Sequence, residues 1–298
     1  MNKKIVDQEA RWAFLFIAPL MLGTLIFSIW PIIQSVYISF TKWDGFTEAT
    51  FAGLDNYIRM FQEHQMLSEF LNTCYFAVGT IPITLIFSLI TACLLNSRIK
   101  GMSLYRTIYF LPNVTMIVAV AVVWRWIMNS KYGLLTDFNN AVGIPAIQWL
   151  GNPKMIMPAV ILVSIWCSIG YNAILLLAGL QGIPAYIYEA SDIDGANAFV
   201  RFFKITLPMV SPTIFFVLIM LIINAFKAFD LIFMFAGATS PQGPILDSVR
   251  TMVYGIYEKG FTFYDMGYAS TEAVVLFIII LIITAIQLKC QERWVNYE

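Results

Sequence analysis

The chain has 298 residues, of which 59% are hydrophobic and 12% are charged, and its formal net charge is zero. A soluble domain of this length cannot bury so much apolar surface, so a lipid bilayer must cover part of it. The balanced charge argues against a nucleic-acid partner, because such proteins carry a basic surface. The composition therefore indicates a membrane protein.

Six intervals without charged residues are long enough, or nearly so, for the roughly 20 residues that cross a hydrocarbon core as a helix. In chain order they are 12–41, 70–97, 107–124, 155–188, 205–226 and 273–288. We therefore expect an all-α polytopic protein with six transmembrane helices in a single domain, residues 1–298. Pro19 and Pro31 are expected to kink the first span, because proline cannot donate a helical hydrogen bond.

Basic residues gather in alternate connecting segments. The segments 1–11, 96–106, 182–207 and 289–298 contain ten of the 18 Lys and Arg residues. The positive-inside rule then places these segments, and with them both chain termini, in the cytoplasm. An even number of spans requires the same arrangement of the termini.

Residues typical of catalytic or metal sites are nearly absent. The single histidine, His64, lies in an acidic outer loop and is expected to be a solvated surface residue. There is no Gly-rich phosphate loop, nucleophile elbow or zinc motif. The chain is therefore not expected to be an enzyme, to hold a metal or to hydrolyse ATP by itself. Four cysteines lie in or beside the predicted spans without metal-ligand spacing and are expected to be structural: Cys74, Cys93, Cys167 and Cys290.

The loop between the fourth and fifth spans, residues 182–207, is long and lies on the predicted cytoplasmic face. After Pro184, residues 186–194 can form a short helix, Gly195 allows a flexible turn, and residues 196–203 can form a second short helix. An exposed knob of this kind is suited to a groove in another protein. The alternative is a simple amphipathic interfacial helix. The second helix is expected to have an apolar face at helical spacing, made by Ala198, Phe199, Phe202 and Phe203.

This loop carries a recognisable pattern. Glu189-Ala190-Ser191, then Gly195, and then Ile205-Thr206-Leu207-Pro208 resembles the EAA signature of binding-protein-dependent ABC importer permeases, with serine in place of the last alanine. The resemblance implies a type I importer permease fold in which this loop forms a cytoplasmic coupling helix against an ATPase subunit. It implies docking roles for Glu189, Ala190 and Gly195, and more loosely for Ser191, Ile205 and Pro208.

Four further segments, residues 31–40, 53–57, 228–232 and 265–270, resemble the carbohydrate branch of that family. They look like the first of its two permease types, as in multiple-sugar, raffinose, lactose and glycerol-phosphate importers. One departure follows Leu231, where the family usually has a tight Gly-Gly-Pro turn and this chain has the longer stretch 237–244. Because that loop is expected to face outside, where a binding protein docks, we expect its specificity to differ from that of the family.

The resemblance also implies partners and a location. These are a bacterial inner (cytoplasmic) membrane, a second homologous permease, two ATPase subunits as a homodimer or heterodimer, an extracytoplasmic sugar-binding protein and a carbohydrate substrate. ATP and Mg would bind to the ATPase, so no cofactor is expected in this chain. Transport would proceed by alternating access.

Polar residues within the spans are candidates for the substrate pathway. Ser164, Ser168 and Tyr171 form one helical stripe on the fourth span. On the fifth, Asn224 lies one turn before Lys227, and Lys227 is expected to form an intrahelical pair with Asp230 beside the cavity. The alternative is helix–helix hydrogen bonding with interfacial snorkelling. Arg125, between Trp124 and Trp126, is expected to anchor the outer interface.

Other functions remain open at this stage. An importer permease for a non-sugar solute fits the same motif. A secondary transporter would need an intramembrane carboxylate, for which Asp230 is the weak candidate. A membrane enzyme would need a cluster of His, Asp or Cys, which the sequence lacks. The substrate can be a monosaccharide, an oligosaccharide, an acidic sugar fragment or glycerol phosphate.

Overall fold

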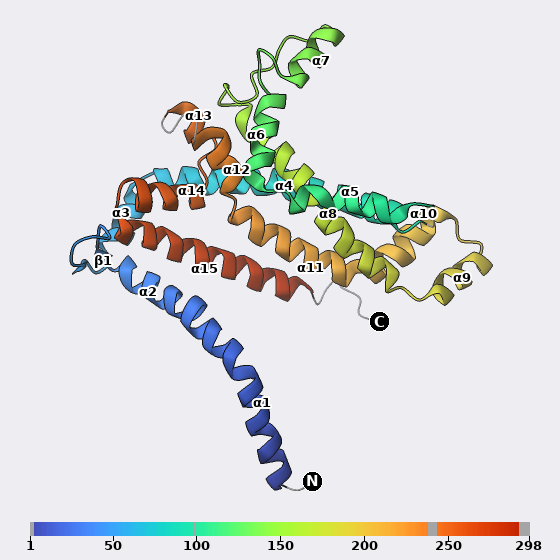
Figure 1. Cartoon of the computed structure of the whole chain (residues 1–298), viewed down its shortest axis with the longest axis horizontal. Coiled ribbons are helices and arrows are strands. Elements are labelled where there is room, and N and C mark those ends of the chain that lie inside the picture. Colours follow the sequence, from blue (N-terminus) through green and yellow to red (C-terminus); the bar gives the residue numbers. More distant parts are fainter. Residues whose placement is uncertain (1–2, 98, 238–242, 292–298) are drawn as a thin grey trace. The chain divides into compact units, whose positions relative to one another are not determined.

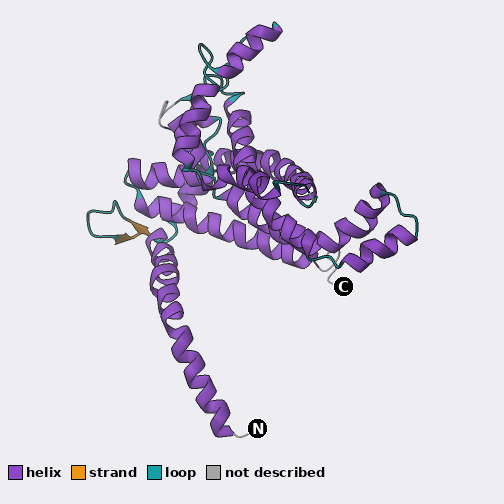
Figure 2. Ribbon diagram, turned by 45° about the vertical axis from the view of Figure 1, so that its right-hand side comes forward, coloured by secondary structure: helices purple, strands orange, loops and turns teal. Residues whose placement is uncertain are grey.

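The computed structural model describes residues 3–97, 99–237 and 243–291, and these are almost wholly helical (Figures 1 and 2). Two compact units are present. The first comprises residues 1–64 and 256–277, and the second comprises residues 65–255 and 278–298. The chain passes between them within helices α14 (Met252–Tyr257) and α15 (Met266–Gln291). The expectation of one domain stays a prediction. Arg98, Arg293 and most of the 237–244 loop, used in the sequence interpretation, lie outside the described residues.

The first unit begins with the predicted first span. It consists of α1 (Lys3–Thr24), a π-helical turn η1 (Leu25–Ile29) and α2 (Trp30–Ser39). The Trp30 N–H bonds to the carbonyl of Leu25, five residues back. Pro31 follows directly and has no N–H to donate, which favours such a widened turn. The interruption therefore lies at Pro31 as expected, whereas α1 continues through Pro19.

A short hairpin follows α2. Its strands β1 (Thr41–Lys42) and β2 (Thr50–Phe51) are antiparallel, with Thr41 opposite Phe51. Helix α3 (Asp55–Gln62) comes next, and its Asn56 side chain donates to the carbonyls of Ser39 at 3.0 Å and Thr41 at 2.8 Å. This buried amide fixes the hairpin to α3 by satisfying two carbonyls that the ends of α2 and β1 leave open.

An ionic cluster joins α3 to the start of α15. Arg59 bonds to Glu63 at 2.8 Å and to Asp265 at 2.6 Å, and Tyr268 donates to Glu63 at 3.0 Å. Partial burial opposes ionisation of Glu63, but the hydrogen bonds from Arg59 and Tyr268 outweigh it and lower the Glu63 pKa. Beside this cluster, Lys259 in the π-helical turn η4 (Glu258–Thr262) pairs with Glu272, and both side chains are buried.

The second unit contains the remaining helices. They are α4 (Gln65–Leu95), α5 (Met102–Val114), α6 (Ile117–Ile127), α7 (Leu134–Val142), α8 (Ile156–Gln181), α9 (Ala185–Ile193), α10 (Ala198–Arg201), η2 (Phe202–Thr206), α11 (Leu207–Phe226), α12 (Asp230–Ile232), η3 (Phe233–Gly237) and α13 (Pro244–Asp247).

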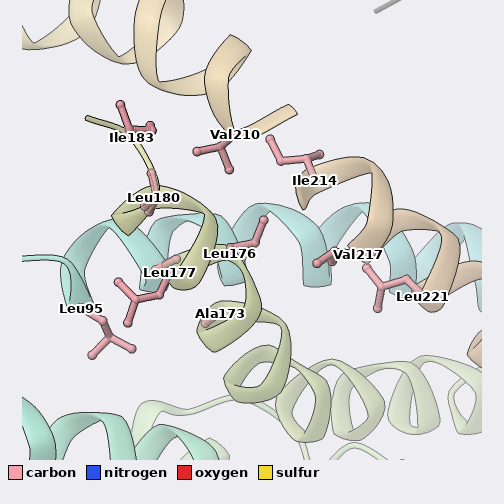
Figure 3. Packing of buried hydrophobic residues seen from close by; sticks show 11 residues of the cluster. Leu95, Ala173, Leu176, Leu177, Leu180, Ile183, Val210, Ile214, Val217 and Leu221 are labelled. Carbon is pink, nitrogen blue, oxygen red and sulfur yellow. The ribbon is translucent and has the colours of Figure 1, made fainter. Parts of the chain in front are cut away.

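The core of this unit lies where α4, α8 and α11 pack together (Figure 3). Leucine and valine side chains from the three helices interdigitate there, and Val217 is completely buried. Small residues allow the close approach. A Cβ on Gly170 of α8 would collide with the carbonyl oxygen of Tyr109 in α5, and one on Gly79 of α4 would lie 2.7 Å from Ile161.

Among the residues that the structure describes, five helical stretches are long and apolar enough to cross a membrane, and the number rises to six if the bent pair α5 and α6 forms one span. The all-helical prediction therefore agrees with the structure. The predicted third span, 107–124, was expected to be one helix and is instead bent by 94° between Val114 and Ile117. Thr115 there has an extended backbone, and Pro112 removes a donor from the last turn of α5.

Candidate functional site

Helices α9 and α10 form the predicted loop between the fourth and fifth spans, at the ends of α8 and α11 (Figure 1). Pro184 caps α9, and Gly195 has a φ of +72°, a conformation that favours glycine. Asn197 then caps α10 by accepting the Val200 N–H at 2.8 Å. The first predicted helix is confirmed. The second begins at Ala198 rather than residue 196, and it continues through η2 into α11 instead of ending at residue 203.

Three contacts hold the two helices of this loop together. Arg201 pairs with Asp192 at 2.6 Å, and its guanidinium lies 5.9 Å from the centre of the Tyr188 ring. The Tyr188 hydroxyl lies 3.2 Å from the Thr206 Oγ1. These residues come from α9, α10 and η2, so the contacts join α9 to the segment that leads into α11.

The residues that the motif singles out differ in exposure. Glu189, Ala190 and Gly195 are exposed, whereas Ile205 and Pro208 are half-buried. Ser191 is buried, and its hydroxyl donates to the Tyr188 carbonyl at 2.7 Å. Only the first three can therefore contact a partner through most of their surface.

Sequence reasoning missed the most exposed apolar side chain of this loop. Ile193, at the end of α9, is 88% exposed. Tyr186 and Phe199, in the same loop, are exposed as well. The sequence indicates this exposure, because Ile193 lies between Asp192 and Asp194 and has no adjacent apolar residue to cover it. Exposed apolar side chains on a polar loop mark a contact surface.

A cavity of about 360 Å³ lies among α4, α6, α8 and α11 within the second unit. Ser164, Ser168, Asn224 and Lys227 all line it, in agreement with the sequence prediction. Tyr171 does not line this cavity, and its place on the substrate pathway stays a prediction. On α8 the cavity reaches from Val160 to Ser168, and Tyr171 lies almost one turn beyond.

Lys227 and Asp230 also line this cavity, but they do not form the expected intrahelical pair. Helix α11 ends at Phe226, and Lys227 is its C-cap residue. Asp230 begins the separate helix α12 after a non-helical step. No ion pair joins the two in the part of the chain that the structure describes, because the helical spacing assumed for them does not exist.

The cavity wall also includes residues that sequence reasoning did not select. The Thr80 side chain is 5% exposed, and its Oγ1 atom is buried without a hydrogen-bond partner among the described residues. Phe229 contributes an aromatic ring. Thr80 resembles the many other polar residues scattered along α4, so only the packing distinguishes it.

Metal-ligating residues do not gather anywhere in the described ranges, where no group of three or more His, Cys, Asp or Glu side chains could hold an ion. His64 is exposed as expected. The four cysteines are free thiols, of which only Cys290 is exposed.

Residues 51–296 match the family described as "Binding-protein-dependent transport system inner membrane component". The chain belongs to this family. The match covers the coupling loop and the cavity together, so the resemblance seen in the EAA pattern is confirmed.

Two relatives match along almost their whole length. The permease is 37% identical over 302 residues to the probable ABC transporter permease protein YesP of Bacillus subtilis (strain 168), covering 100% of this chain and 96% of that protein. It is 34% identical over 294 residues to the sn-glycerol-3-phosphate transport system permease protein UgpA of Escherichia coli (strain UTI89 / UPEC), covering 97% of each.

Two solved structures share the fold. A bacterial alginate ABC transporter in complex with an alginate pentasaccharide-bound periplasmic protein contains a chain with a TM-score of 0.83 at 21% identity, covering 98% of this chain and 96% of that one. A bacterial ABC transporter involved in the import of alginate gives 0.78 at 22% identity, covering 97% and 99%. The predicted type I ABC importer permease fold is therefore confirmed.

Family membership decides between the functional classes left open by the sequence. The permease is an inner-membrane component of a transport system that depends on a binding protein. It is a transport subunit rather than an enzyme, and the interpretations as a secondary transporter or a membrane enzyme no longer apply.

Proposed function

We propose that this permease is a subunit of an ATP-driven importer of carbohydrates. It forms half of the pathway with a second homologous permease and changes between inward-open and outward-open states. ATP and Mg bind to two partner ATPase subunits, and an extracytoplasmic sugar-binding protein delivers the substrate. The proposal is supported by relatives named for glycerol-3-phosphate transport and by the shared fold of alginate transporters.

This proposal rests on the polar wall of the cavity of about 360 Å³ among α4, α6, α8 and α11, which we call the main cavity. Ser164, Ser168 and Asn224 supply hydroxyl and amide groups, and the buried Thr80 Oγ1 has an unused hydrogen-bonding capacity. Such an atom costs free energy when it stays unpaired, so a ligand hydroxyl there would be favoured. With the Phe229 ring, these groups make the mixture of polar and aromatic contacts that sugars prefer.

The coupling role is proposed for the exposed part of the loop. Glu189 presents a carboxylate, and Gly195 presents backbone atoms that no side chain covers. The exposed Ile193 presents an apolar side chain. A groove on the ATPase could receive all three. The distribution of Lys and Arg supports a cytoplasmic position for this loop and for both termini.

The proposal is tested with the complete importer reconstituted in proteoliposomes. A thermal-shift screen of the cognate binding protein first identifies the ligand, and uptake of that ligand is then measured. We expect Asn224→Leu to reduce uptake by at least tenfold, because the substrate loses a hydrogen bond to the amide and meets an apolar side chain in its place. Tyr171→Phe is the matched control and should transport normally.

Two results would contradict the proposal. A cognate binding protein that recognises only amino acids or peptides would identify a non-sugar importer. Full uptake by the Asn224→Leu variant would show that the substrate does not pass along this wall. Subunit assembly is checked by size-exclusion chromatography in each case, so that loss of folding is not mistaken for loss of transport.

A further inference from the structure

A second cavity, of about 300 Å³, lies in the same unit beyond the end of α6. Its polar and aromatic wall residues come from the last turn of α6, from the two loop segments that flank α7, and from η3. They are Arg125, Asn129, Ser130, Gln148 and Trp149, with Phe235 of η3 completing the wall. None of the roles proposed above for the main cavity or the coupling loop uses these residues.

One hydrogen-bond donor at this cavity lacks an acceptor, and the Arg125 guanidinium makes a single hydrogen bond. The indole Nε1 of Trp149 is buried and has no partner among the described residues. The half-buried guanidinium of Arg125 makes one bond, to the Met234 carbonyl at 3.3 Å, and no carboxylate of the described chain pairs with it. The Arg125 side chain lines this cavity, and its expected role as an anchor at the outer interface stays a prediction. A partly buried cation without a counter-charge is costly, so this site favours an anion.

The surrounding residues reinforce that preference. Asn129 uses its Oδ1 to accept the N–H groups of Lys131, at 2.9 Å, and Tyr132, at 3.3 Å. Its amide nitrogen is therefore left as the donor group. No Asp or Glu is present among the residues that line this cavity, in contrast to the main cavity with Asp230.

The position of this second cavity suits an outer site on the same route. Along α6, Ile117 lines the main cavity and Arg125 lines the second, and eight residues of helix separate them by about 12 Å. The segment after α11 repeats this order, with Asp230 at the main cavity and Phe235 at the second.

Helix α8 separates the second cavity from the coupling loop. Gly151, at the second cavity, precedes α8, whereas the coupling loop follows its end. The 26 residues of α8 measure about 39 Å, enough to cross a membrane. The second cavity therefore lies at the opposite end of the unit from the coupling loop.

We infer that the second cavity is an outer loading site for the anionic group, carboxylate or phosphate, of an acidic carbohydrate. Arg125 binds the anion through two parallel N–H groups, and the Trp149 N–H and Asn129 amide bind its remaining oxygens or a neighbouring hydroxyl. The anion then moves past Phe235 towards Lys227. This inference rests on the proposed carbohydrate importer function.

The test measures equilibrium binding to the assembled importer in nanodiscs without its binding protein. Three probes are compared: digalacturonate, glycerol 3-phosphate and the neutral disaccharide galactobiose. We expect at least one anionic probe to bind more tightly than galactobiose. Arg125→Gln should weaken that binding by about tenfold or more, as expected for a lost charged hydrogen bond, and Arg125→Lys should weaken it less.

Two further variants separate the site from general damage to the fold. Trp149→Phe keeps an aromatic ring but removes the N–H, and should weaken the anionic probe by about threefold to tenfold. Arg106→Gln changes another half-buried arginine, which bonds to the Leu95 carbonyl and lies outside this cavity, and should leave binding unchanged.

The results distinguish the ligand and the two proposals. Preference for digalacturonate identifies a carboxylate site, and preference for glycerol 3-phosphate identifies a phosphate site. Equal binding of all three probes, or unchanged binding in Arg125→Gln, would overturn the inference even if the importer transports a carbohydrate. Failure of the complete importer to take up any carbohydrate would instead refute the proposed function.

Discussion

Arg201 in α10 reaches back across Gly195 and pairs with Asp192 in α9, with 2.6 Å between Nη1 and Oδ1. The pair closes the loop at its turn, where backbone hydrogen bonds from the Gly195 N–H to the Asp192 carbonyl, at 3.2 Å, and from the Ala196 N–H to the Ser191 carbonyl, at 3.0 Å, also hold the chain. The side chains of Arg201 and Asp192 are 34% and 64% exposed, so the pair is expected to contribute little to global stability. Its effect is local, because it fixes how α9 is presented.

We predict that Arg201→Gln loosens this loop without unfolding the protein. The melting temperature should change little, whereas substrate uptake per ATP hydrolysed should fall by about twofold to fivefold, since a surface ion pair holds only local order. Uptake and ATP hydrolysis are measured on the same proteoliposomes. The charge-swapped double variant Asp192→Arg, Arg201→Asp should recover part of the coupling. A swap no better than either single change would rule out the ion pair as the cause.

We predict that Glu189→Lys leaves the protein inserted but separates it from its ATPase. Glu189 is exposed, and no side-chain hydrogen bond or ion pair joins it to the described part of the chain, so reversal of its charge acts at the partner surface. Co-purification of the ATPase and ATP-driven uptake should both fall by at least tenfold. Glu48→Lys, an equally exposed position outside the loop, is the control. Normal uptake and assembly in Glu189→Lys would disprove the coupling assignment.

The approach of α8 to α5 predicts a strong effect of one methyl group. A Cβ at Gly170 would collide with the Tyr109 carbonyl, which is backbone and cannot rotate away. Gly170→Ala should therefore destabilise the second unit by about 1–3 kcal/mol through overpacking. Thermal unfolding in detergent measures this. Gly23→Ala, where a Cβ meets nothing within 4 Å, should unfold at the wild-type temperature or slightly above it.

The buried Lys259–Glu272 pair gives a prediction for the first unit. Glu272→Gln removes the charge that compensates Lys259 and should cost about 3–5 kcal/mol, because a buried cation then loses its ionic partner. The double variant Lys259→Met, Glu272→Leu replaces both charges by apolar groups and should recover most of the loss. Thermal unfolding of the three proteins is compared. A double variant less stable than Glu272→Gln would show that the pair itself supplies the stability.

Several features of this protein were readable from the sequence because they depend on neighbouring residues. Apolar length predicts a membrane span, and the spacing from Glu189 to Pro208 predicts the coupling loop whatever lies around it. Ser164 and Ser168 share a helix face at a spacing of four, so their common placement on a cavity wall also followed from local geometry.

Tertiary structure decided the features that depend on where helices end and what packs against them. The end of α11 at Phe226 separates Lys227 from Asp230, and the cavity along α8 extends only to Ser168, so Tyr171 does not line it. The 94° bend after α5 divides the third predicted span. Arg125 lines a cavity together with residues of the loops before and after α7. Hydrophobic patterning acts over a few residues of one helix, whereas these outcomes depend on contacts between distant segments, which a pattern in one segment does not contain.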